Sequence, residues 1–460
     1  MIEISKEFIM SYKPLKNKKI TVVGAERSGV AAALFLKTQG NDVFLTELKP
    51  KENIKENISE LEPAGIKAEF GGHTAQALNA GVIVISPGVP SNAPLIHEAI
   101  EKNIPVISEI EVGYQFFPKP IIAITGTNGK TTTTAMTGHL FEVAGKKPLV
   151  AGNIGDAFTG TYKEWNSVDY GVLEISSFQL DHVDSFKPKI SMLLNITPDH
   201  LDRYKTYNHY IQSKFRITEQ QAEKDIFIYN ADSEVIAPFI NMTKAQKWPF
   251  SIEKPLHFGA WVENEQFMVQ LNGKAEEIMK TSDMFIKGKH NQYNALAAIL
   301  AAKAEGISND KIAEGLKSFK GVAHRIEFVR EINGVPFYND SKATNVDSLK
   351  WALGSFSSPI VLIAGGRDYG KNSYEDIESL IEENVKLIVT IGEAAEKIEH
   401  DLGKFVKVIH AKSLKESIEI AKENAVQKDI VLFSPACKSF DMFKDYVDRG
   451  NQFKDIVNGL

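Results

Sequence analysis

The amino-acid sequence predicts an α/β protein of three domains, and three observations support this fold class. Short apolar runs alternate with helical stretches along the chain, which is typical of mostly parallel sheets. The 460 residues exceed the size of one hydrophobic core. The alternating pattern restarts twice, so we expect domains over residues 1–115, 116–320 and 321–460.

The first domain opens as a Rossmann-like unit. Apolar residues 19–23 precede a turn over 24–29 and a helical stretch, and the next strand ends at Glu47. Glu26 stands where the dinucleotide fingerprint needs its second glycine, which disfavours an NAD site. The block could bind a different nucleotide, or its turn residues could be ordinary loop residues. The candidate contacts are Arg27, Ser28, Thr46, Glu47, Ser86 and Gly88.

The most informative motif, residues 121–132, opens the second domain. Four apolar residues predict a buried strand, a glycine-rich turn follows, and a helix starts at about Thr131. Backbone N–H groups and the helix dipole then converge on one point, which favours a phosphate. Lys130 would reach the terminal phosphates, and the Thr131 hydroxyl would hold a magnesium ion. The turn is shorter than the common P-loop, because Ile124 stands where that motif has its first glycine.

Other strand ends of the second domain would face the same edge of the sheet. Glu174 ends an apolar strand and could hold magnesium, although it could also cap a helix. His200 follows another strand and could ligate a second metal with Asp199 as its partner, although a lone histidine is more often structural. Lys214 lies on a following helix, where one lysine is usually a solvated side chain.

Polar residues around and beyond the junction of the second and third domains add further candidates, each of which could also be a capping or loop residue. Asn291 and Asn294 lead into an alanine-rich helix and could read an adenine, and Arg325 could reach a γ-phosphate. Asp340 follows a strand and could bind a ribose. Lys342 and Thr344 follow the same strand, and Ser439 follows the last predicted strand of the chain. These three residues could contact an anionic substrate.

The amino-acid composition excludes several classes of protein. The formal net charge of −6 gives no basic field for binding nucleic acid. The single cysteine, Cys437, excludes an internal disulfide and is expected to be a small buried residue. No apolar run approaches the roughly 20 residues that span a bilayer, and the N-terminal residues do not form a signal peptide. We therefore expect a cytoplasmic protein that does not insert into membranes.

Seven motifs, in order along nearly the whole chain, resemble those of the Mur ligases. They lie at residues 126–132, 195–203, 290–295, 324–325, 339–345, 434–441 and 449–451. The last two narrow the resemblance to the D-glutamate-adding branch of the family. The resemblance implies a UDP-binding Rossmann-like domain, a central P-loop ATPase, and a C-terminal Rossmann-like domain for the incoming amino acid.

The resemblance also implies an activity, that of an ATP-dependent carboxylate–amine ligase of cell-wall peptidoglycan synthesis. ATP would phosphorylate the carboxylate of UDP-N-acetylmuramoyl-L-alanine, and the amine of D-glutamate would attack the acyl phosphate. A tetrahedral intermediate would then release phosphate, ADP having left in the first step. Two magnesium ions would assist, and we expect the enzyme to be a monomer.

Roles for individual residues follow from the same resemblance. Catalysis would depend on Lys130, His200 and Lys214, the last as a carbamate. The metal ions would be held by Thr131, Glu174, His200 and carbamylated Lys214. ATP would contact Gly126, Thr127, Asn128, Gly129, Lys130, Thr131, Thr132, Asn291, Asn294, Arg325 and Asp340. The UDP substrate would contact Asn153 in addition to the first-domain residues named above. D-Glutamate would contact Lys342, Thr344, Ser439 and Tyr446, with a further cation at either Arg367 or Lys371.

Two other interpretations remain open from the sequence. A sister ligase, such as a folylpolyglutamate synthetase or an enzyme of another Mur step, would share the P-loop. A nucleotide-driven switch would hydrolyse ATP without a small-molecule acceptor, but it leaves the two flanking Rossmann-like blocks without a role.

Overall fold

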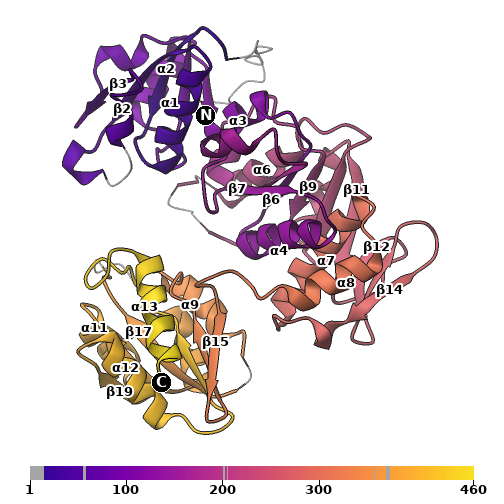
Figure 1. Cartoon of the computed structure of the whole chain (residues 1–460), viewed down its shortest axis with the longest axis vertical. Helices are drawn as coiled ribbons and strands as arrows, with labels where there is room; N and C mark the ends of the chain where they lie inside the picture. Colours follow the sequence, from indigo (N-terminus) through magenta and orange to yellow (C-terminus); the bar gives the residue numbers. More distant parts are fainter. Residues whose placement is uncertain (1–14, 55–57, 200–202, 205, 357, 369–372) are drawn as a thin grey trace. The chain divides into compact units, whose positions relative to one another are not determined.

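The computed structural model describes residues 15–54, 58–199, 203–204, 206–356, 358–368 and 373–460, whose strands form three sheets (Figure 1). The chain divides into two compact units. One comprises residues 1–284 and 291–317 and carries the first two sheets; the other comprises residues 285–290 and 318–460 and carries the third. Helices alternate with the strands in each sheet region, so the predicted α/β class with mostly parallel sheets is confirmed.

The first sheet is parallel throughout, with the order β3-β2-β1-β4-β5. Its strands are buried on both faces: Val22 belongs to the core that includes α1, whereas Val23 belongs to the cluster that includes α2. This burial explains why the strands appear in the sequence as continuous apolar runs. The strands are β1 (Lys19–Val23), β2 (Asp42–Glu47), β3 (Lys67–Phe70), β4 (Val82–Ile85) and β5 (Val106–Ser108). The helices are α1 (Arg27–Thr38), α2 (Pro94–Glu101) and α3 (Glu109–Phe116).

The second sheet has the order β14-β13-β12-β11-β10-β9-β6-β8-β7. It is parallel from β7 to β12. The strands of the parallel part are β6 (Ile121–Thr125), β7 (Pro148–Gly152), β8 (Tyr170–Glu174), β9 (Ile190–Leu193), β10 (Ile226–Asn230), β11 (Gln246–Ser251) and β12 (Gly259–Glu263). The helices of this region are α4 (Lys130–Val143), α5 (Ser177–Leu180), α6 (Tyr207–Phe215), α7 (Lys289–Ala304) and α8 (Asn309–Ser318).

An antiparallel extension continues this sheet through β13 (Gln266–Gln270) and β14 (Glu276–Lys280). This extension was not predicted from the sequence. Its strands are short, and charged or amide residues stand at their ends, so they lack the apolar runs by which the parallel strands were recognised.

The third sheet has the order β15-β16-β20-β17-β18-β19, with β15 antiparallel to β16 and the other neighbours parallel. Leu432 of β20 packs with α9–α11 on one face, and Phe433 packs with α12 and α13 on the other. The strands are β15 (Glu327–Ile332), β16 (Val335–Asn339), β17 (Ile360–Gly365), β18 (Val385–Ile391), β19 (Val408–His410) and β20 (Ile430–Phe433). The helices are α9 (Val346–Leu353), α10 (Glu378–Asn384), α11 (Ala395–Leu402), α12 (Leu414–Asn424) and α13 (Tyr446–Asn458).

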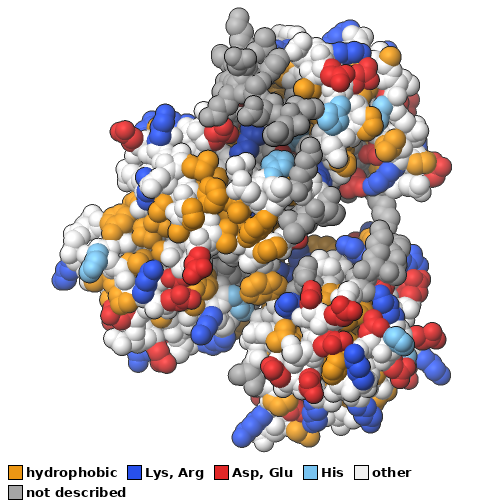
Figure 2. All heavy atoms as spheres, turned by 180° about the vertical axis from the view of Figure 1, so that it is seen from behind, with side chains coloured by type: hydrophobic (Ala, Val, Ile, Leu, Met, Phe, Trp, Pro, Cys, Tyr) orange, Lys and Arg blue, Asp and Glu red, His pale blue; other side chains and the backbone are white. Residues whose placement is uncertain are grey.

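The surface carries both signs of charge. On the face drawn in Figure 2, acidic and basic side chains of the described residues are interspersed, in keeping with the formal net charge of −6. None of the described helices has both the length and the hydropathy that crossing a membrane requires. Cys437 is buried, as expected, with 1% of its surface exposed.

Candidate active site

The P-loop motif forms the predicted strand, turn and helix. β6 ends at Thr125, Gly126 and Gly129 have positive φ, and α4 begins at Lys130, one residue before the expected start. The N-terminus of α4 therefore opens directly from the glycine turn. Its first N–H groups have no partners within the helix, which makes this point favourable for an anion.

The loop after β9 holds the glycine turn in place. Asn195 accepts a hydrogen bond from the Asn128 N–H (2.8 Å) and donates one to the Asn128 carbonyl (3.0 Å). Thr127 donates its backbone N–H to the Asn195 carbonyl (3.0 Å), and its hydroxyl accepts from the Thr197 N–H (3.1 Å). The turn is thus fixed before any ligand binds. Asn195 belonged to a recognised motif, but no such holding role was predicted for it.

Two lysines converge on one carbonyl of this turn. Lys130 Nζ donates to the Gly126 oxygen (2.9 Å) and the Thr127 oxygen (2.8 Å), and Lys214 Nζ donates to the same Gly126 oxygen (2.9 Å). Lys214 is 2% exposed, so the interpretation of this residue as a solvated side chain is wrong. Burial, and then the nearby Lys130 ammonium, holds the pKa of Lys214 well below its usual value. This shift favours the neutral amine over the ammonium.

Glu174 ends β8 at the same edge of the sheet, since β8 and β9 both pair with β6. Its Oε1 accepts a hydrogen bond from Asn153 Nδ2 (2.7 Å), while its buried Oε2 has no hydrogen-bond partner among the described residues. The alternative role as a helix cap is wrong, because Ser176 caps α5. The predicted metal ligand and the predicted substrate residue Asn153 are therefore direct neighbours.

These oxygens fit a magnesium ion, which prefers hard oxygen ligands and retains several waters. The unpaired Oε2 of Glu174 and the hydroxyl of Thr131, in the first turn of α4, are two candidate oxygen ligands among the described residues. The described part of the chain contains no group of three or more His, Cys, Asp or Glu side chains arranged to hold a metal. His200, the predicted second ligand, lies outside the described residues.

Of the two predicted adenine residues, Asn294 lies against the P-loop segment and Asn291 is hydrogen-bonded to Asn294. Asn294, near the start of α7, accepts a hydrogen bond from the Thr133 hydroxyl (3.1 Å) and donates one to Asn291 (3.1 Å). A Cβ on Gly129 would lie 2.4 Å from Asn294 Oδ1, and Gly129 has a φ of +81°. Only glycine therefore allows the turn and α7 to approach this closely.

A glycine substitution tests this close approach. The Gly129→Ala variant should bind ATP at least about tenfold more weakly, because the new methyl group displaces Asn294 and shifts the start of α4. Gly145, beyond the other end of α4, is a matched control: its φ is +76°, but no atom lies within 4 Å of an added Cβ. Gly145→Ala should suffer similar backbone strain and bind ATP within about twofold of the parent. Calorimetry that finds equal losses in both variants contradicts the packing argument.

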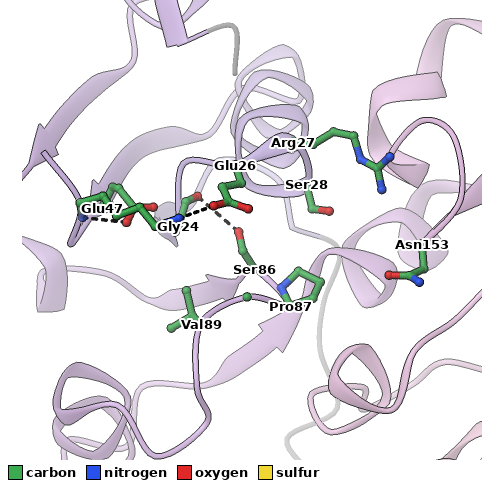
Figure 3. Close-up of a pocket in the computed structure, with 11 residues that line it drawn as sticks. Gly24, Glu26, Arg27, Ser28, Glu47, Ser86, Pro87, Val89 and Asn153 are labelled. Atoms are coloured by element: carbon green, nitrogen blue, oxygen red, sulfur yellow. Dashed lines mark hydrogen bonds and ion pairs between the residues drawn. The ribbon is translucent and has the colours of Figure 1, made fainter. Parts of the chain in front are cut away.

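A cavity of about 390 Å³ opens at the carboxyl edge of the first sheet (Figure 3). Six of the seven residues predicted to bind the UDP substrate line it, namely Arg27, Ser28, Glu47, Ser86, Gly88 and Asn153. Thr46 does not line it. This residue is fully buried, and its hydroxyl is hydrogen-bonded to Glu69 and His73 (2.7 Å each). Any effect of Thr46 on a ligand in the cavity is therefore indirect.

Charged groups at the cavity were only partly predicted. Glu26 pairs with Lys49, and both side chains line the cavity. Glu47 accepts the Ala25 N–H (2.7 Å), which fixes the turn after β1. Arg27 extends from α1 toward the loop that carries Asn153, as Figure 3 shows, and donates to the Gly152 and Gly155 carbonyls. Lys49 was missed, although its position two residues beyond the strand-end Glu47 could have indicated it.

In the unit that carries the third sheet, Asp340 follows β16 and is 1% exposed. Its carboxylate accepts hydrogen bonds from the Ser434 hydroxyl (2.8 Å) and the Ile326 N–H (3.2 Å). Burial raises the pKa of Asp340 to about 6, and the nearby Arg325 opposes that shift. The two ATP residues predicted in this unit therefore interact with one another.

The raised pKa of Asp340 predicts how the folding stability of the protein depends on pH. Between the unfolded pKa of 3.8 and the folded value of about 6, the folded state binds more protons, so stability should fall as the pH rises through this range. The difference is on the order of 3 kcal/mol at most. Asp340→Asn, which keeps the shape of the side chain, should flatten this part of the curve. The free energy of unfolding is measured with urea at several pH values from 4 to 7. If it changes equally with pH in Asp340→Asn and in the parent protein, the raised pKa of Asp340 is contradicted.

The four residues predicted to bind D-glutamate gather at the same edge of the third sheet. Lys342 and Thr344 follow β16, Ser439 follows the adjacent β20, and Tyr446 begins α13. Lys438 Nζ donates to the Thr344 hydroxyl (3.3 Å), which joins the two loops. Ser341 donates its hydroxyl to the Tyr446 carbonyl (2.8 Å), which joins the first loop to the helix.

A buried arginine, which had been noted only as part of a motif, holds this edge together. Arg449 of α13 is fully buried and donates to the Ser341 hydroxyl (3.0 Å), the Ser341 carbonyl (2.8 Å) and the Cys437 carbonyl (3.1 Å). Of the two candidates for a further cation, Arg367 makes two hydrogen bonds to the Glu393 carboxylate (2.6 and 3.0 Å). Lys371 lies outside the described residues.

A P-loop with a second, buried lysine, in an α/β chain whose strands form three sheets, indicates a nucleotide-binding protein of several domains. Comparison with known families identifies which one. The MurD-like N-terminal domain of Mur ligases matches residues 18–108, the Mur ligase middle domain matches 124–302, and the Mur ligase glutamate ligase domain matches 324–437.

Curated relatives match along almost the whole chain. The UDP-N-acetylmuramoylalanine--D-glutamate ligase of Salinibacter ruber is 42% identical, with 98% of this chain and 100% of the relative covered. The enzyme of that name from Christiangramia forsetii is 44% identical, with 96% and 100% covered. The chain therefore belongs to the Mur ligase family and is a ligase.

Solved structures share the fold. UDP-N-acetylmuramate-alanine ligase MurC from Thermotoga maritima aligns with a TM-score of 0.58 at 21% identity, covering 96% of this chain and 99% of that one. MurF ligase from the same organism aligns with a TM-score of 0.58 at 14% identity, covering 97% and 100%.

Proposed function

We propose that the protein joins D-glutamate to UDP-N-acetylmuramoyl-L-alanine with cleavage of ATP to ADP and phosphate, in peptidoglycan precursor synthesis. The observation that carries the proposal is the match, along 96–98% of the chain, to relatives that bear the name of this activity. We assign residues 1–115 to UDP binding, 116–320 to ATP and 321–460 to the incoming amino acid. A cytoplasmic location fits a reaction that consumes ATP. The protein is predicted to be a monomer, which analytical ultracentrifugation can test.

The hydrogen bond between Asn153 and Glu174 supports this reaction. Asn153 lines the cavity proposed for the UDP substrate, and Glu174 stands at the strand edge next to the P-loop. A substrate whose nucleotide lay in the cavity and whose other end reached Asn153 would bring its carboxylate toward the γ-phosphate. A free carboxylate is a poor electrophile, so transfer of the phosphoryl group to it precedes bond formation.

The proposed mechanism assigns charge stabilisation to the chain's own groups. The α4 N-terminus and Lys130 would bind the transferring phosphoryl group while a carboxylate oxygen attacks phosphorus and ADP leaves. The amine of D-glutamate would then attack the acyl carbon, and phosphate would leave as the amide forms and a proton is lost. Arg325 and Asp340 would bind ATP, and Lys342, Thr344, Ser439 and Tyr446 would bind D-glutamate.

Magnesium at two sites would offset the negative charge that crowds together in this step. Thr131 and Glu174 would hold the first ion, and His200 and Lys214 the second. Lys214 can serve only as a carbamate, formed when its neutral amine adds to carbon dioxide and loses a proton. Its burial and its lowered pKa support this modification.

Acceptor dependence tests the proposed function. Phosphate release from ATP should require UDP-N-acetylmuramoyl-L-alanine and D-glutamate together, and L-glutamate should not replace the D enantiomer. Equal release without an acceptor would instead support a nucleotide-driven switch. Release with a folate acceptor, or with the substrate of another Mur step, would support a sister ligase.

A further inference from the structure

A carboxylate outside the predicted site holds three elements of the second sheet region together. Asp232 lies in the turn after β10. It accepts hydrogen bonds from the Ser251 hydroxyl at the end of β11 (2.6 Å), from the Ile252 N–H (2.9 Å) and from the Tyr293 hydroxyl on α7 (3.0 Å). The first two bonds fix the carboxylate against the sheet edge. The third attaches the helix to it.

Tyr293 lies on α7 between Asn291 and Asn294, the second of which contacts the P-loop helix. Asn294, the next residue, is 4% exposed and accepts from the Thr133 hydroxyl, and its amide donates to Asn291. The first turns of α7 are thus held on two sides, by the P-loop helix through Asn294 and by the edge of β10 and β11 through Tyr293. Two attachments in different directions restrict both the rotation and the translation of this part of the helix.

The middle of α7 does not supply such a restraint, and the next polar attachment is at its far end, where Lys303 Nζ donates to Glu276 (2.9 Å). From Ala295 to Ala302 the helix buries small or aliphatic side chains, which pack without directional bonds. The Tyr293 ring also packs near Phe250 of β11, with centroids 6.3 Å apart. Burial, and then the Asp232 carboxylate, raises the pKa of Tyr293, so its hydroxyl remains a donor at all physiological pH values.

We infer that Asp232 and Tyr293 are positioning residues for the nucleotide, which orient Asn291 and Asn294 toward the adenine of ATP while leaving the phosphate subsite to the P-loop. This inference rests on the proposed function. It predicts that loss of the Asp232–Tyr293 hydrogen bond weakens recognition of the base without weakening recognition of the phosphates.

The Tyr293→Phe variant tests the inference, because it removes one oxygen and keeps the ring. The dissociation constant for ATP and the KM for ATP should each rise about tenfold. The affinity for inorganic tripolyphosphate, the turnover number and the KM for the UDP substrate should each change less than about twofold. Asp232→Asn, which keeps one acceptor oxygen, should lose less ATP affinity than Asp232→Ala.

Tyr229→Phe is the matched control. Tyr229 lies on β10, half-buried beside Phe227, and the described residues give its hydroxyl no hydrogen bond. Its ATP affinity should equal that of the parent protein. Calorimetry that finds no ATP binding by the parent protein overturns the proposed function together with the inference. A parent that binds ATP while Tyr293→Phe binds it equally well overturns the inference alone, and so does an equal loss for ATP and tripolyphosphate.

Discussion

The Lys130→Ala variant should lose ligase turnover by about a thousandfold or more. Lys130 is the first residue of α4, and its ammonium lies within 2.9 Å of two carbonyls of the glycine turn. A triphosphate bound there would exchange these carbonyls for phosphate oxygens. Without this cation, less positive charge would offset the negative charge of the transferring phosphoryl group.

A lysine at the opposite end of the strands, Lys224, provides the control for this variant. Lys224 is exposed in the turn before β10, and because the sheet is parallel here, the starts of its strands lie away from the P-loop. Lys224→Ala should retain full turnover. Initial-rate measurements test this prediction. A turnover number of Lys130→Ala within tenfold of the parent value would exclude a role for this lysine in phosphate binding.

The Lys214→Ala variant should lose activity to a similar extent, for a different reason. Lys214 is buried against the Gly126 carbonyl and the Tyr210 ring, with Nζ 4.5 Å from the ring centroid. The proposed carbamate would add two oxygens that share one negative charge, in a place where the unmodified amine offers no oxygen. A short carboxylate such as acetate could enter the space left by the truncated side chain and partly restore the rate.

This rescue separates a missing carbamate from a damaged fold. Acetate should restore part of the activity of Lys214→Ala and none of that of Lys130→Ala, which loses a cation. Acid-quenched assays with increasing acetate provide the comparison. Full activity of Lys214→Ala without acetate, or equal rescue of both variants, would contradict the assigned role.

The parallel strands and the P-loop could be predicted because their signals are local. A parallel strand that is buried on both faces needs a continuous apolar run, as in residues 121–124, and a phosphate turn needs glycine beside lysine. The carboxyl ends of parallel strands meet at one edge of the sheet. The proximity of Glu174 to the glycine turn could therefore also be predicted from the order of apolar runs. The antiparallel strands β13 and β14 have no comparable run and were missed.

Features that depend on distant contacts could not be predicted from spacing. The burial of Lys214 arises because α6 packs against the glycine turn 88 residues earlier, and nothing in the helix itself indicates it. Thr46 was expected at the cavity because it is near the end of β2, but its hydroxyl bonds to Glu69 on the neighbouring strand. The Asp232–Tyr293 bond joins residues 61 positions apart, and no motif contains both.

Transfer of a labelled oxygen tests the central claim most directly. UDP-N-acetylmuramoyl-L-alanine carrying ¹⁸O in both carboxylate oxygens would be supplied with ATP and D-glutamate, and the released phosphate would be analysed by mass spectrometry. If the carboxylate is phosphorylated at the P-loop, each phosphate carries one ¹⁸O atom from the substrate. Phosphate without the label would mean that water attacks ATP, which would contradict the account.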